Sequence, residues 1–130
     1  MKNFDNAAPI FLQIVESLLS DIAKGVLKPG DKVPPVRVLA AEYKVNPNTM
    51  QKSLEKLGEA GYLYTERTSG RFVTEDAAKI EELKQQIPMK MTENFVREML
   101  DFGIPQGEIN VYVERYLKEK SGKENFEQEN

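Results

Sequence analysis

Residues 36–55 read VRVLAAEYKVNPNTMQKSLE, and they contain two short helical patterns separated by three residues. The first pattern begins at Val36 and runs to about Tyr43, with its apolar residues on one face. The second begins after Asn46, a residue type that caps helix N-termini, and Pro47 suits its first helical position. Two helices joined by so tight a turn are typical of a helix-turn-helix, which we expect over about residues 36–55.

The segments on either side extend this pattern. Upstream, apolar residues spaced three and four apart predict a helix that follows Pro9 and ends at Gly25. Downstream, two β-prone runs flank the polar stretch 67–70, which is typical of a hairpin tip. Three helices followed by a hairpin predict a winged helix-turn-helix over residues 1–75, with its wing at about 62–74. The expected fold class is therefore mainly α with a small β-hairpin.

The rest of the chain has a helical pattern of its own. Residues 76–120 are predicted to form a helical region, in which Pro88 indicates either a kink or two abutting helices. Residues 121–130 contain too few apolar side chains to pack, and we expect a disordered tail there. A stripe of apolar residues at helical spacing runs along the region: Ile80, Leu83, Ile87, Met91, Phe95, Met99 and Phe102.

This apolar stripe needs a surface to cover it, and so small a region offers little core of its own. We expect the region to hold two copies of the chain together as a homodimer through these residues. The alternative is that the stripe packs against the first helix of the same chain. Its methionines and Phe95 also fit a ligand pocket, although such a cluster is more often ordinary core or interface.

The composition excludes several classes of protein. The 130 residues include no cysteine and no histidine, which removes thiol catalysis, the usual catalytic triad and the common zinc ligands. We therefore expect no catalytic residue, no metal and no cofactor, and we interpret the chain as a protein other than an enzyme. The first residues lack the apolar run of a signal peptide, and no stretch is apolar enough for a membrane span. These features predict a soluble cytoplasmic protein without a membrane partner.

The net charge of −3 is unevenly distributed along the chain. Residues 1–75 hold ten Lys and Arg against nine Asp and Glu, whereas residues 76–130 hold eight against twelve. The acidic excess therefore belongs to the C-terminal part. A local basic surface on the first 75 residues stays compatible with nucleic-acid binding.

In a helix-turn-helix, the N-terminal residues of the second helix lie nearest the bases of the major groove. Arg37, at the start of the preceding helix, is placed to reach a phosphate, and a wing tip with Arg67, Thr68 and Gly70 suits a minor groove. The alternative is a winged fold that docks another protein without touching DNA. Asn and Gln can recognise adenine, Thr reaches bases or phosphates, and Lys supplies a positive charge, so the candidates are Asn46, Asn48, Thr49, Gln51 and Lys52.

An ordered set of short matches makes the interpretation more specific. Residues 9–73 resemble the N-terminal domain of GntR-family bacterial transcription regulators. The resemblance implies DNA contacts by Arg37, by the stretch Asn46 to Lys52, which includes Pro47, and by the wing near Arg67 and Gly70. It rests on Pro9-Ile10-Phe11, Gly25-Val26-Leu27-Lys28-Pro29-Gly30-Asp31, Val33-Pro34 with Arg37 and Leu39-Ala40, Val45-Asn46-Pro47-Asn48-Thr49, Gly61-Tyr62-Leu63, and Gly70 with Phe72-Val73.

Two positions depart from the family pattern. Pro35 stands where the family usually has a small polar residue, so one phosphate contact is in question. Thr68 stands at the first glycine of the usual wing sequence, and threonine tolerates a positive φ poorly. The conformation of the wing is therefore left open.

The short acidic C-terminal region resembles the YtrA subfamily, whose C-terminal helices mainly dimerise the protein. This resemblance implies a homodimeric repressor that binds an inverted-repeat operator in double-stranded DNA and blocks polymerase, with a transporter operon as the suggested target. No residue pattern identifies a small-molecule effector. A hypothetical effector site would lie between the winged domain and the helical region.

Overall fold

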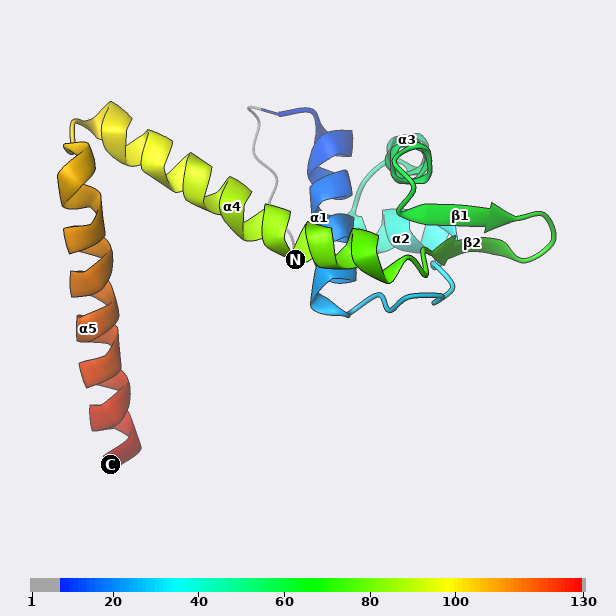
Figure 1. The fold of residues 1–130 in the computed structure, drawn as a ribbon. Helices are drawn as coiled ribbons and strands as arrows, with labels where there is room; N and C mark the ends of the chain where they lie inside the picture. The colour runs from blue at the N-terminus through cyan, green and yellow to red at the C-terminus, as the bar shows by residue number, and fades with distance from the viewer. Residues whose placement is uncertain (1–7, 130) are drawn as a thin grey trace. The chain divides into compact units, whose positions relative to one another are not determined.

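The computed structural model describes residues 8–129, and side chains over residues 8–124. Its elements follow the order α1, α2, α3, β1, β2, α4, η1 and α5 (Figure 1). The chain forms two compact units, the first ending at Ile87 and the second beginning at Pro88. The bounds of the elements are α1 Ile10–Lys24, α2 Val36–Tyr43, α3 Pro47–Glu59, β1 Leu63–Glu66, β2 Gly70–Val73, α4 Ala77–Phe102, η1 Gln106–Glu108 and α5 Ile109–Glu129.

The predicted helix ends in the first unit are confirmed by their local geometry. The side-chain oxygen of Asn46 accepts a hydrogen bond of 2.7 Å from the backbone N–H of Asn48, so Asn46 caps α3 and Pro47 begins it. Gly25 ends α1 in the left-handed conformation, at φ 78°. Lys44 ends α2 at φ 56°, and it is the one residue other than glycine with a positive φ in the described part of the chain.

One apolar core holds the first unit together. Each of α1, α2 and α3 buries the face that its sequence period predicts, and the base of the hairpin closes the core. The first turns of α4 also contribute, because Ile80 and Leu83 are buried among these residues. The unit therefore extends past residue 75, where the sequence predicts its end. The other members of the core are Ile14, Leu18, Ile22, Val33, Leu39, Ala40, Met50, Leu54, Leu57, Leu63 and Val73.

The wing is an antiparallel hairpin with Leu63 opposite Val73 and Glu66 opposite Gly70. The backbone N–H of Ser69 bonds the carbonyl of Glu66 at 3.2 Å, which closes a tight turn. Gly70 has φ 103°, whereas the φ of Thr68 is not positive. The wing turn therefore does not require a positive φ at Thr68, although threonine replaces a glycine of the family pattern there.

The helix α4 continues through Pro88, so of the two expected outcomes the break into abutting helices is wrong. The hydroxyl of Thr92 donates a hydrogen bond of 2.8 Å to the carbonyl of Pro88, one turn earlier. The backbone N–H groups of Gly103, at φ 108°, and Ile104 then bond the carbonyls of Leu100 and Met99, and the helix ends there.

The prediction of a disordered tail over residues 121–130 is corrected by the structure, in which α5 continues to Glu129. The tail has few apolar residues for packing, but its Glu, Lys and Gln are good helix formers. An ion pair one turn apart also supports the helix, with Lys120 and Glu124 at 3.7 Å. Asn130 lies outside the described residues. Across residues 8–129, no helix combines the length and apolar character that crossing a bilayer requires.

Candidate nucleic-acid interface

The helix α3 presents a polar face outward. Met50, Ser53, Leu54 and Leu57 are buried, and they fix which side of the helix faces the core. The opposite side of α3 follows from the helical period. It carries the exposed residues Asn48, Lys52 and Glu55, with the half-buried Thr49 and Gln51 at its edges.

Asn46 has a structural task at the start of this face. Its side-chain oxygen accepts a hydrogen bond in the cap of α3, which fixes the side chain and leaves its NH₂ group as the donor for a base or a phosphate. Pro47 is exposed beside it and carries no N–H. Of the two asparagines, Asn48 is therefore the one whose whole amide is available for base recognition.

Lys52 is positioned by an aromatic ring of α1. Its Nζ lies 3.9 Å from the centre of the Phe11 ring, a cation–π contact that holds the ammonium near the N-terminal end of α3. Ile10, Phe11, Asn48, Thr49 and Lys52 line a shallow hollow of about 410 Å³ there. The candidates Asn48, Thr49 and Lys52 thus lie together.

Gln51 is also held by a neighbour. Its Nε2 donates a hydrogen bond of 2.9 Å to Oε1 of Glu55, one turn further along α3. Glu55 places a carboxylate on the outward face of α3, and this charge would repel a phosphate near the helix.

A second group of candidates meets between the wing and the start of α2. The segment Lys32–Val36 and the wing residues Thr65, Ser69, Gly70 and Arg71 line a hollow of about 310 Å³. Pro35 provides no side-chain cap for α2, so the first amides of this helix are left to an anion or to water. Lys32 and Arg71 are among its lining residues, but the surface that lines the hollow is almost entirely apolar. Arg37 is exposed in the first turn of α2, next to Val36 of this hollow.

Arg67 and Thr68 lie in the exposed wing turn and do not line this hollow. Among the described residues, no group of three acidic side chains forms a candidate metal site.

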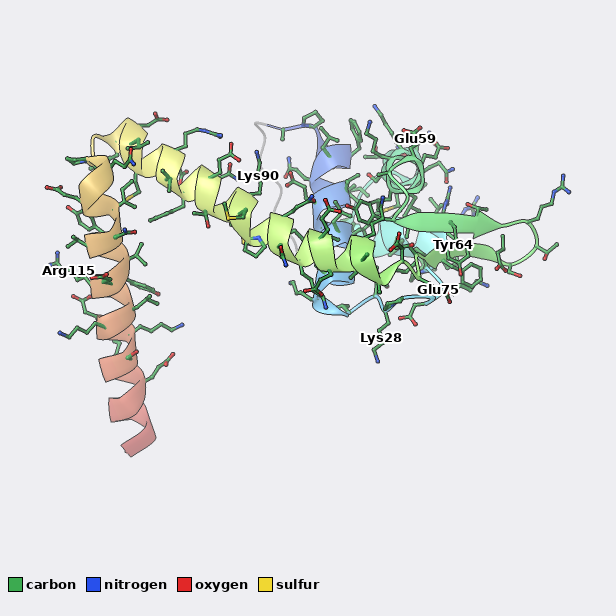
Figure 2. The ribbon with its side chains drawn as sticks, in the orientation of Figure 1. Lys28, Glu59, Tyr64, Glu75, Lys90 and Arg115 are labelled. Atoms are coloured by element: carbon green, nitrogen blue, oxygen red, sulfur yellow. The ribbon has the colours of Figure 1, made fainter. Side chains whose placement is uncertain are left out.

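The wing also carries an aromatic pair. Tyr64 stacks on Phe72 with ring centres 5.6 Å apart and an interplanar angle of 22°. Partial burial raises the pKa of the Tyr64 phenol, and the nearby carboxylates of Glu75 and Glu66 raise it further (Figure 2).

The predicted dimerisation stripe is divided by the structure. Ile80 and Leu83 are 6% and 3% exposed and lie in the core of their own chain, so the alternative of packing within the chain holds for them. Ile87 packs partly against the same core. Beyond Pro88, Met99 is half-buried, and the exposed members of the stripe are Met91, Phe95 and Phe102.

Residues 11–73 match the family described as bacterial regulatory proteins, gntR family. A regulator from Bacillus subtilis, the uncharacterised HTH-type protein YhcF, is 36% identical over 106 residues, which cover 82% of this chain and 88% of YhcF. The chain belongs to the GntR family. The repressor YtrA of the same organism is 39% identical to this GntR protein over 72 residues, 55% of each chain, in agreement with a YtrA-like subfamily.

Solved structures of relatives agree with the fold of this GntR-family protein. A GntR family transcriptional regulator from Listeria monocytogenes superposes with a TM-score of 0.75 at 39% identity, over 86% of this chain and 98% of that one. The DNA-binding domain of AraR, in complex with the operator ORR3, superposes with a TM-score of 0.50 at 28% identity, over 57% of this chain and 87% of that one. The expected winged helix-turn-helix followed by a helical region is confirmed.

Three residues of this candidate interface were not predicted from the sequence. Phe11 lies within the quoted family matches, but its contact with Lys52 joins residues 41 positions apart. Lys32 lies beside the wing because its backbone pairs with that of Phe72. The contact of Glu55 with Gln51 could have been predicted, because residues four apart are neighbours on a helix.

Proposed function

We propose that this GntR-family protein is a homodimeric transcriptional repressor that binds an inverted-repeat DNA operator. The observation that carries the proposal is the outward face of α3, where Asn48 and Lys52 lie opposite the buried stripe of the helix and Gln51 lies at the edge of the face. In a winged helix-turn-helix, this end of the second helix enters the major groove. The DNA-binding domain of AraR, which has this fold, is in complex with an operator in its structure, and this supports operator binding by the present protein.

The proposed division of labour follows from the chemistry of each group. The amides of Asn48 and Gln51 read base edges, Lys52 and Arg37 bind phosphates, and the wing with Arg67 and Gly70 approaches a minor groove. The protein works in the cytoplasm, where bacterial DNA lies, and needs no cofactor.

The second unit supplies the dimer in this proposal. Its exposed apolar side chains lie on α4 beyond Pro88 and on α5, where Phe102 is 85% and Tyr116 64% exposed. A second copy covering this surface would set two recognition helices on one operator, about 34 Å apart. Repression agrees with the names of YtrA and of an arabinose metabolism repressor from Geobacillus stearothermophilus, which is 31% identical over 75 residues. The YtrA resemblance extends the proposal to a transporter operon.

The test is selection of bound sites from random DNA by the purified protein at about 150 mM salt. An enriched inverted repeat is expected. On that site, Gln51→Ala is expected to relax the preference at one base pair per half-site, at a cost of about 1–3 kcal/mol. A protein that enriches no sequence would contradict the proposal and favour a protein-docking role.

Arg37→Ala distinguishes phosphate binding from base reading. It is expected to weaken binding to all sequences alike and to lower the slope of log affinity against log salt by about one per subunit. Lys28→Ala is the matched control, because it also removes one positive charge from the first unit but lies in the turn after α1, away from α3 (Figure 2). An equal effect of both variants would show that only total charge matters.

A further inference from the structure

The pair Gln51 and Glu55 lies at the edge of the outward face of α3. The amide nitrogen of Gln51 donates to the Glu55 carboxylate at 2.9 Å. Gln51 is half-buried and Glu55 is exposed, and neither belongs to the core. The contact therefore does little for the packing of the first unit. Its effect is on Gln51 itself, because it determines which side of the amide remains available to a ligand.

A glutamine amide has two faces with different hydrogen-bonding roles. Its oxygen accepts and its NH₂ group donates, and rotation by 180° about the last side-chain bond exchanges the two. An ionised carboxylate only accepts, so Glu55 is compatible with the NH₂ group facing it and repels the oxygen. The contact thus selects one of the two amide orientations of Gln51.

The selected orientation changes what Gln51 recognises. With its oxygen turned away from Glu55 and one N–H left to donate, the amide matches the N6 donor and N7 acceptor of adenine. The flipped amide would offer N–H donors, which suit the N7 and O6 acceptors of guanine. We propose that Glu55 is a positioning residue that sets Gln51 to read adenine and reject guanine. The inference rests on the proposed function, in which α3 reads bases.

Two physical effects of Glu55 on DNA binding have opposite signs. Its negative charge repels phosphates and lowers the affinity for every sequence. Its hydrogen bond to Gln51 strengthens as water leaves the groove, because the local dielectric falls, and this sharpens the preference for one base. Removing the charge while keeping the shape is therefore expected to raise general affinity and reduce specificity together.

Glu55→Gln tests the proposal, because the new amide pairs with either orientation of Gln51. The site selected by the wild-type protein is changed from adenine to guanine at the base pair that Gln51→Ala identifies, and the affinities for both sites are measured. The expected loss of discrimination in Glu55→Gln is about five- to tenfold, with tighter binding to unrelated DNA. In the double variant Gln51→Ala/Glu55→Gln, the preference at this base pair should equal that of Gln51→Ala alone.

Glu59→Gln is the matched control. It makes the same change of charge at the last residue of α3 (Figure 2), but the residue one turn earlier is Glu55 rather than a glutamine. It should raise general affinity and leave the base preference unchanged, with far-UV circular dichroism and melting temperature confirming that each variant folds.

Three results would overturn the inference. Retention of the wild-type preference in Glu55→Gln would show that Glu55 does not position Gln51. Loss of preference at a different base pair would show that Glu55 contacts a base itself. Failure of the wild-type protein to enrich any sequence would overturn the proposed function, and the inference with it, before any variant is compared.

Discussion

The hydroxyl of Ser53 in α3 donates a hydrogen bond of 2.8 Å to the main-chain carbonyl of Phe11 in α1. Ser53 is fully buried, and among the residues whose side chains the structure describes it is the one polar residue that is buried. The ring of the same Phe11 lies beneath the Lys52 ammonium. The first turn of α1 therefore fixes both the backbone position of α3 and one of its outward charges.

Ser53→Ala is expected to lower the free energy of unfolding by about 1–2 kcal/mol, because a buried hydrogen bond is lost and the Phe11 carbonyl loses a partner. Urea unfolding followed by circular dichroism measures the change. The exposed Ser69→Ala is the control and should stay within about 0.5 kcal/mol of wild type. Equal stability of the two variants would mean that this bond contributes nothing to folding.

Lys44→Gly is expected to stabilise the protein by about 0.5 kcal/mol. Lys44 has φ 56°, where a side chain costs about 1–2 kcal/mol, and the extra freedom of glycine in the unfolded chain offsets part of the gain. The same substitution at Lys56, within α3, should destabilise by about 1 kcal/mol, because glycine is a poor helix residue. Thermal and urea unfolding of both variants should give shifts of opposite sign. Shifts of the same sign would refute the conformational explanation.

Phe95→Glu is expected to convert a dimer into a monomer. Phe95 is 39% exposed on α4 beyond Pro88, among apolar side chains that the proposed partner covers, and a carboxylate there would lose its water. Sedimentation equilibrium should give twice 14.8 kDa for the wild type and a single chain for the variant. The neighbouring Asn94→Glu is the control and should remain dimeric. A wild-type protein that sediments as a single chain would rule out the proposed dimer.

Glu75→Gln is expected to lower the pKa of Tyr64 toward its ordinary value of 10.0, because one of the carboxylates that oppose the phenolate is removed (Figure 2). Since the pKa is raised in the folded state, the associated stability is present below pH 10 and is lost as the pH rises through the folded pKa. NMR titration of labelled tyrosines, assigned with Tyr64→Phe, measures the pKa. Glu81→Gln is the control, and an unchanged pKa in Glu75→Gln would remove Glu75 as a cause.

Local sequence signals were sufficient to predict the helix ends and the buried helix faces of the first unit. Asn46 and Pro47 define the start of α3, and Gly25 the end of α1, by the conformations that these residue types favour within a few positions of chain. Apolar spacing indicated which face of each helix is buried. The set of residues on the outward face of α3 followed from the same period, which is why most of the candidate interface could be named in advance.

Pairwise contacts within that interface were harder to predict. The contact of Phe11 with Lys52, like the hydrogen bond that Ser53 donates to the Phe11 carbonyl, joins segments about 40 residues apart. No local pattern encodes which side chains meet over such a separation. Thr68 is a similar case. Whether its φ is positive depends on the register of the whole hairpin, with Glu66 opposite Gly70.

By itself, the sequence determined the helices and the hairpin of this protein, because helix caps, turn residues and apolar period act over short distances along the chain. The tertiary structure was needed to show which part of the long apolar stripe is covered within its own chain. Periodicity gives Ile80 and Phe102 the same status, yet Ile80 is 6% exposed and Phe102 is 85% exposed. The hydrophobic effect rewards removal from water without specifying the covering surface, so that choice depends on how the whole unit folds.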